Sequence, residues 1–315
     1  MQRKQCNASV PGTPARTFEL TRLLSAVQNQ SASPFLKLPP EIRNQIFQLV
    51  LGGKLIHTFG EGRFHSICPH HESESEACEQ YLRTGKDQEY ITRHRMCLSS
   101  KLGDGRLLNL SLVYTCKQTY FEARHLVYSL NAFFFHDSKS LRFFASSLHP
   151  RQLRAISSLH LSIEVVFRLD AEEWQRPLTS AFVKSFKGLE HLRIFINVGF
   201  VRLKDHVLLQ AESLETYFFA PLLRFQRLPL KTATVVFSDE AAFRVWGDQG
   251  FLSYGNAFAE EFGFRWTAET KKECAKRIED RLLAPWDEDA ASYERAKFIV
   301  MRRARWKLWD GGFGA

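Results

Sequence analysis

Histidine and cysteine residues gather in the polar stretch between residues 54 and 106, and two pairs of them share the same spacing. His65 and Cys68 form one His-x₂-Cys pair, and His94 and Cys97 form the other. Zinc prefers four nitrogen or sulfur ligands in a tetrahedron, and a loop can bring two such pairs together. The spacing therefore predicts a structural zinc site at these four residues. The alternative is that they carry no function in a variable loop.

The residue patterns that would indicate an enzyme are missing from the sequence. It contains no Gly-x-Gly-x-x-Gly or Gly-x₄-Gly-Lys-Ser/Thr phosphate loop, no Gly-x-Ser-x-Gly elbow and no His-Glu-x-x-His motif. Asp170, Glu172 and Glu173 stand where a helix is expected to start, and acidic residues are ordinary there. Cys116 is expected to be a small buried side chain rather than a nucleophile. We therefore expect a protein that is not an enzyme.

The segment from Pro34 to Gly53 has the clearest pattern in the chain. Pro39 and Pro40 are suited to the start of a helix, because proline loses no helical hydrogen bond there, and Gly52 and Gly53 are suited to its end. Apolar residues recur at helical spacing between these limits, at Ile42, Ile46, Leu49 and Val50, with Phe47 and Leu51 beside them. Arg43, Asn44, Gln45 and Gln48 are expected on the opposite, solvent side. The apolar side either packs on the helix's own domain or binds a partner.

Two blocks of the first half resemble a group of fungal F-box-like proteins of unknown function. The first block is the start at Pro34, in which Leu38-Pro39-Pro40-Glu41-Ile42 looks like the opening of an F-box. The second block carries a Cys-x-Gln-x-Tyr-x-Glu-Ala pattern from Cys116 to Ala123 and continues to Phe135. The resemblance implies a substrate adaptor of a ubiquitin ligase that docks on a Skp1-type adaptor protein. The expected partner-binding residues are Leu38, Pro39, Ile42, Ile46, Leu49 and Val50.

The second half alternates between strand and helix patterns. Strands are expected at 132–136, 156–167, 189–198 and 232–237, with helices at 138–148, 174–186 and 203–227, after a helix at 107–128. Such alternation predicts an α/β fold with parallel strands, or α+β for the whole chain. The similar segments at Ile156–Leu161 and Phe186–Ile194 favour either an irregular leucine-rich-like repeat or an ordinary α/β sandwich.

These patterns divide the chain into four parts. We expect a mobile tail at 1–33, an F-box-like helical region at 34–130 with a polar insert at 54–106, an alternating β/α domain at 131–265, and a basic helical tail at 266–315. No signal peptide is recognisable at Met1, and no apolar run reaches the roughly 20 residues that span a bilayer. We therefore expect an intracellular protein, cytoplasmic or nuclear, with reduced cysteines.

The net charge of +9 leaves a second hypothesis about the function open. Basic and aromatic residues alternate between Arg295 and Trp309, a pattern that can bind RNA or an anionic membrane surface. The simpler interpretation is that Trp306 and Trp309 dock on the domain while the arginines remain solvated. The leading hypothesis is therefore a protein-interaction module, and the alternative is a nucleic-acid or membrane-surface binder that uses its C-terminal tail.

Overall fold

The centre of the molecule is a six-stranded sheet. The computed structural model describes residues 33–59, 64–68, 74–84, 97, 108–165, 174, 177–198, 221–238 and 267–287. The strand order is β2-β1-β3-β4-β5-β6. The strands are β1 (Leu55–Phe59), β2 (Phe64–Ile67), β3 (Ala132–Phe135), β4 (Ser158–Val165), β5 (His191–Val198) and β6 (Thr232–Ser238). Only β2 pairs antiparallel, and the other neighbours are parallel. The predicted α/β class is confirmed.

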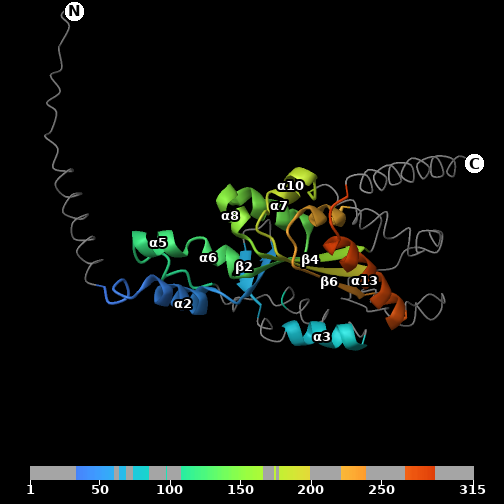
Figure 1. Cartoon of the computed structure of the whole chain (residues 1–315), viewed down its shortest axis with the longest axis horizontal. Helices are drawn as coiled ribbons and strands as arrows, with labels where there is room; N and C mark the ends of the chain where they lie inside the picture. The colour runs from blue at the N-terminus through green and yellow to red at the C-terminus, as the bar shows by residue number, and fades with distance from the viewer. Residues whose placement is uncertain are drawn as a thin grey trace, which may run out of the picture.

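Helices cover the two faces of the sheet unequally. The helices α7 (Ser138–Ser147), α8 (Pro150–Ala155) and α10 (Ser180–Lys184) lie on one side, whereas α3 (Glu74–Thr84) lies on the other (Figure 1). The side chain of Asp137 caps α7 by accepting a hydrogen bond from the backbone of Ser140. The sheet is therefore the middle of three layers.

The face under α7 and α10 is the hydrophobic core. Residues at alternate strand positions point into it, including Phe133 and Phe135 of β3, Leu159 and Leu161 of β4, and Ile194 of β5. The opposite face is more polar although it is also buried. It carries His57, His160, Ser162 and Asn197, which are at most 8% exposed. Buried polar side chains that could bind a ligand or a metal therefore lie on this second face of the sheet.

The strand order follows the chain from β3 to β6. The register aligns the strand starts Ala132, Ser158, His191 and Thr232 in one row, at steps of 26, 33 and 41 residues. A sequential order with helices on one face suits a stack of strand–helix units. The unequal steps and the presence of α3 on the second face depart from a regular repeat.

A close approach of two backbones fixes the entry to β5. A Cβ atom on Gly188 would collide with the carbonyl oxygen of Arg154, at the end of α8. Two residues later the backbone N–H groups of Glu190 and His191 both donate to the carbonyl of Ser157, at 2.9 Å. Glycine is therefore required where the two chain segments meet.

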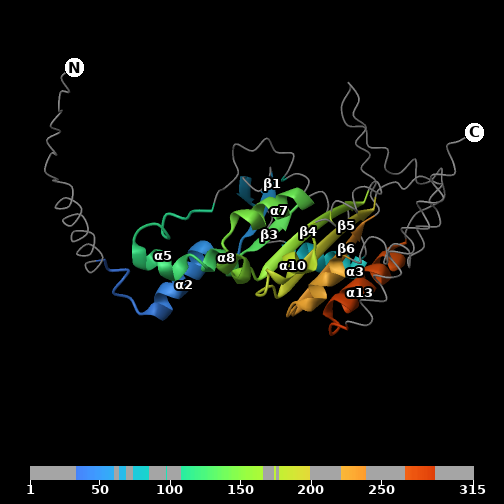
Figure 2. The same cartoon turned by 90° about the horizontal axis from the view of Figure 1, so that it is seen from above.

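A second group of helices lies at one end of the sheet (Figure 2). It contains α2 (Pro40–Leu51), α5 (Lys117–Ala123) and α6 (Leu126–Ser129). The predicted helix at Pro40–Leu51 is confirmed. The predicted continuous helix at 107–128 is wrong, because residues 111–115 form turns and a break at Arg124 and His125 separates α5 from α6. Cys116 is half-buried and caps the start of α5, where its sulfur accepts from the backbone of Thr119.

Parts of the chain outside the predicted β/α domain also contribute to the sheet and its core. The predicted polar insert at 54–106 supplies β1, β2 and α3, while α2 before it and α5 and α6 after it pack together. The first part of the predicted basic tail forms α13 (Ala268–Leu283), which packs on β6 and joins the hydrophobic core through Cys274, Ala275, Ile278 and Leu282. Residues 1–32 and 288–315 lie outside the described part of the chain.

The remaining helix predictions are met only in part. Within the predicted helix at 174–186, the structure describes the helix α10 and one further helical residue, Trp174. In the predicted helix at 203–227, it describes the 3₁₀ helix η4 (Leu222–Arg227), and residues 201–220 lie outside the described part. The tighter helix packs Leu222 and Phe225 into the core beside α13.

Candidate functional site

The helix α2 presents an apolar stripe to solvent. Leu49 is 80% exposed, Val50 is 43% exposed and Ile42 is 40% exposed. Ile46 lies between them and is half-buried. These residues follow the helical spacing predicted from the sequence, so they form one continuous side of the helix. Leu49, Val50 and Ile42 are therefore exposed rather than packed against the described part of the fold. We call the side formed by these four residues the α2 stripe.

The other side of α2 is buried against α5, α6 and the turn before them. Phe47 and Leu51 are fully buried and pack with Val113 and Ala123. The ring of Phe35 meets that of Phe47 edge-on, with centroids 5.6 Å apart. The sequence pattern placed Phe47 and Leu51 next to the apolar side, whereas in the structure these two residues form the side of α2 that packs on the domain. The helix is therefore anchored on one side, and the α2 stripe faces away from the anchor.

Arg43 corrects the sequence-based assignment of polar residues on α2. It was expected on the solvent side, but it is 6% exposed and lies between α2 and α5. Its guanidinium donates to both carboxylate oxygens of Glu122, at 2.9 and 2.7 Å, and to the carbonyl oxygen of Leu38 at 2.5 Å. These hydrogen bonds from Arg43 hold the pKa of Glu122 below its ordinary value, and the bond to Glu122 raises the pKa of Arg43. One side chain thus fixes both α5 and the segment before α2.

The six predicted partner-binding residues take two kinds of position. Pro39 is exposed together with Ile42, Leu49 and Val50, whereas Leu38 and Ile46 are half-buried. Leu38 precedes the helix, and its carbonyl oxygen is held by Arg43. The structure therefore brings all six onto the start and the outer side of α2.

Asn131 holds the far end of α2. Its side-chain amide donates to the carbonyl of Leu51, at 2.7 Å, and to the carbonyl of Val127, at 2.8 Å. Its side-chain oxygen accepts from the backbone of Lys54 at 2.9 Å. Helix ends leave carbonyl groups without intrahelical partners, and this buried amide satisfies one at α2 and one at α6. The orientation of α2 is therefore defined at both ends.

The predicted zinc ligands are brought together only in part. The sulfur atoms of Cys68 and Cys97 lie 3.9 Å apart, and both residues are buried. Among the described side chains, the third neighbouring donor is His57 of β1. The register pairs His65 with Thr58, whereas His57 pairs with Ser66. The side chain of His65 and the whole of His94 lie outside the described part of the chain.

Sequence reasoning missed His57 and an exposed aromatic group. His57 could have been found from the strand-like run Leu55-Ile56-His57-Thr58-Phe59, in which alternate residues share a face. The aromatic group is formed by Tyr114, Tyr120 and Phe121, of which Tyr114 is 70% and Phe121 is 61% exposed. Arg124 lies 4.9 Å from the ring centroid of Phe121. The prediction of one continuous helix at 107–128 did not reveal this group, because the turns at 111–115 bring Tyr114 close to Tyr120.

The basic residues of α13 have structural partners. Lys271 is 8% exposed, Lys272 donates to the backbone of Arg83, and Lys276 pairs with Asp280 four residues away. Glu279 on the same helix accepts from the backbone of Val235 at 2.7 Å, and burial raises its pKa. This part of the predicted basic tail thus secures the β6 edge of the sheet. The aromatic and basic run from Arg295 to Trp309 lies outside the described residues.

Among the described residues, no helix combines the length and the apolar character needed to cross a membrane.

Comparison with known proteins identifies the family of this chain. Searches of curated proteins and of solved structures find no significant match. The model of a domain of unknown function, DUF7730, matches residues 28–213, a range that includes the α2 stripe, Arg43, Glu122, Asn131 and the cysteines 68 and 97. The chain therefore belongs to the DUF7730 family.

Proposed function

We propose that this protein is a non-enzymatic interaction module and that the α2 stripe docks on a partner protein. The observation that carries the proposal is the exposure of Leu49, at 80%, on a helix whose other side is fixed by buried contacts. An exposed leucine alone is ordinary, but three neighbouring aliphatic residues on one rigid helix form a surface that a partner can bury. Amphipathic helices bind partner grooves through residues at this spacing.

The partner we propose is a Skp1-type adaptor protein, with this chain acting as an F-box-like substrate adaptor of a ubiquitin ligase. The resemblance of Leu38 to Ile42 to an F-box opening supports this choice, as does the exposed position of Pro39 and Ile42. The α/β domain that follows would then carry the substrate-reading surface. Anchoring by Arg43 and Asn131 keeps the docking helix at a fixed orientation relative to that domain, which lowers the entropy lost on binding.

The test is co-purification of the full chain with a purified Skp1-type adaptor. We expect the wild type to be retained and the double variant Ile42→Asp/Leu49→Asp to lose retention, because two charges would be buried in an apolar contact. Leu283→Asp is the matched control, since Leu283 is a 44% exposed leucine on α13. It should bind like the wild type. The proposal fails if the wild type is not retained, or if the folded double variant binds equally well.

The alternative function, binding of nucleic acid or a membrane surface, depends on the C-terminal run from Arg295 to Trp309. On α13, Lys272 and Lys276 bond to groups of the fold, and the apolar side of the helix packs in the core. Its distinguishing sign would be retention of the full chain on a polyanion that weakens steeply as salt is raised. Removal of residues 288–315 would then abolish retention on the polyanion and leave adaptor binding unchanged.

A further inference from the structure

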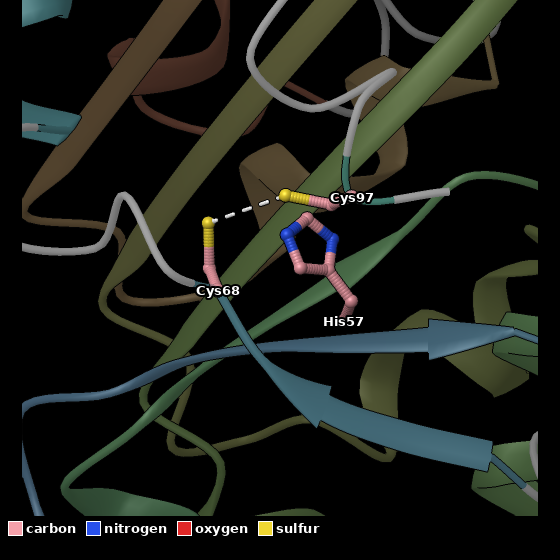
Figure 3. A group of neighbouring side chains, drawn as sticks. All are labelled: His57, Cys68 and Cys97. Atoms are coloured by element: carbon pink, nitrogen blue, oxygen red, sulfur yellow. Dashed lines mark hydrogen bonds between the residues drawn. The ribbon is translucent and has the colours of Figure 1, made fainter. Parts of the chain in front are cut away.

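The polar face of the sheet brings three metal-binding side chains to one place. His57 lies in β1, Cys68 directly follows β2, and Cys97 comes from a distant part of the chain, as Figure 3 shows. One ligand atom from each lies within 4.8 Å of the others, and none of the three residues is more than 5% exposed. The backbone of Cys68 donates to the carbonyl of Leu55 at 2.7 Å, which fixes the cysteine at the end of the β1–β2 hairpin. The position of the group is therefore set by the sheet.

The spacing of the sulfur atoms matches a zinc site better than a disulfide. Two thiolates bound to one zinc at about 2.3 Å, at the tetrahedral angle, lie about 3.8 Å apart. The sulfur atoms of Cys68 and Cys97 lie 3.9 Å apart. A disulfide would need about 2.05 Å between them. Imidazole nitrogen together with two thiolates is also a ligand set that suits zinc. We infer that His57, Cys68 and Cys97 form a structural zinc site.

The contact between His57 and His136 adds an argument from orientation. Nδ1 of His57 lies 2.9 Å from Nε2 of His136, and the two rings stack with centroids 5.1 Å apart. Nε2 of His57 is therefore the nitrogen directed at the sulfur atoms, as the ring in Figure 3 shows. Metal-binding histidines ordinarily bond through their second nitrogen to a neighbouring group that fixes the ring and its tautomer. His136 has this position, so we assign it as a positioning residue for the site.

The site has a structural rather than a catalytic character. Its three donors are buried beside Leu55 and Phe134, which form an apolar cluster with the two cysteines. Burial excludes the substrate access that an open catalytic zinc needs. The metal would connect β1, the end of β2 and the segment around Cys97. The chain between Cys68 and Cys97 contains α3, which lies on the polar face of the sheet, so the metal would fasten this part of the insert to the domain.

The first test measures the metal in the full chain. We expect about one zinc per chain after purification without chelator, and loss of zinc together with lower thermal stability after treatment with a chelator. Zinc should also protect the thiols of Cys68 and Cys97 from alkylation in the folded protein, as mapped by peptide mass spectrometry. This readout uses the wild type alone, so it does not depend on the folding of a variant.

The second test uses matched substitutions. We expect Cys68→Ser and Cys97→Ser to weaken zinc binding more than about tenfold, and His136→Ala to weaken it about 10- to 100-fold. Cys78→Ser and Cys274→Ser replace buried cysteines outside the group and should leave zinc binding unchanged. The inference is overturned if the folded wild type holds no zinc and is unaffected by chelator, if the folded double variant Cys68→Ser/Cys97→Ser keeps it, or if Cys68 and Cys97 are found as a disulfide.

Discussion

Arg43 of α2 donates two hydrogen bonds to the carboxylate of Glu122 of α5, at 2.9 and 2.7 Å. The two residues belong to two separate blocks of the sequence, Pro34 to Gly53 and Cys116 to Phe135. The pair therefore gives those blocks a common physical role, because it joins the helix that follows the prolines to the helix that follows Cys116. Gln118 supports the carboxylate from one turn earlier, at 3.0 Å.

This pair predicts a dependence of stability on pH. The pKa of Glu122 is lowered chiefly by the hydrogen bond from Arg43, so its contribution to stability is complete above the unfolded pKa, near 4.5. That contribution is lost as the pH falls through the lower, folded pKa. We expect Glu122→Gln to destabilise the protein at pH 7 and to differ progressively less from the wild type as the pH falls below about 4.

The measurement is urea unfolding of both proteins between pH 7 and pH 3. Glu190→Gln is the matched control, because Glu190 also has a lowered pKa but pairs with Lys231 at the surface. Screening by solvent should make its effect smaller than that of Glu122→Gln. A constant difference between wild type and Glu122→Gln over this pH range would contradict the assigned role.

Truncation of a side chain should lower the free energy of unfolding much more on the buried side of α2 than on the exposed side. Phe47→Ala removes a fully buried ring and should lower the free energy of unfolding by about 3–5 kcal/mol. Leu49→Ala removes an exposed side chain and should change it by less than about 0.5 kcal/mol. Chemical denaturation of the isolated chain checks both. A large loss of stability with Leu49→Ala would mean that the α2 stripe packs inside the molecule and would also weaken the docking proposal.

Loss of the Asn131 side chain should lower the free energy of unfolding, because this side chain bonds to the ends of two helices, α2 and α6. Asn131→Leu leaves the carbonyl groups of Leu51 and Val127 and the N–H of Lys54 without this partner. A buried polar group left unsatisfied costs about 1–3 kcal/mol, so we expect a loss of at least that size. Asn109→Leu is the control, since Asn109 is exposed and its side chain accepts a hydrogen bond from the local backbone N–H of Ser111. Hydrogen exchange should show faster opening at the end of α2 in Asn131→Leu alone.

The zinc ligand that sequence spacing predicted at His94 has its own test. Tetrahedral zinc takes four ligands, and the described residues supply His57, Cys68 and Cys97. We expect His94→Ala to weaken zinc binding at least about tenfold and to change the visible spectrum of the cobalt-substituted protein, since a thiolate-rich tetrahedral site would lose a nitrogen. His191→Ala, an exposed histidine on β5, is the control. An unchanged spectrum would assign the fourth position to another group.

The sequence predicted the elements with strong local patterns and failed where long-range packing decides. The strands at β3, β4, β5 and β6 and the helices α2 and α7 follow from periodicity, proline and the Asp137 cap. Arg43 could not be placed, because its burial depends on a carboxylate 79 residues away. The run at Leu55–Phe59 was assigned to an insert, because its polar surroundings concealed a strand that finds its parallel partner only in β3.

The candidate sites show the same limit. Spacing identified Cys68 and Cys97 because each stands near a histidine, and the structure does bring their sulfur atoms together. The spacing of histidine and cysteine along the chain did not select His57, because the identity of the third donor depends on which residue of β1 faces the end of β2 after the sheet has formed. For α2, the apolar periodicity was correct, but periodicity does not say which part of a wide apolar surface is covered.

The order of the strands has a consequence for how the chain acquires its shape during synthesis. From β3 to β6, each new strand is added next to one that has already left the ribosome, so the sheet can grow by accretion. The hairpin of β1 and β2 is made earlier but cannot join until β3 emerges. Until then it exposes an unpaired edge, which is the stage at which this nascent chain would need protection from aggregation.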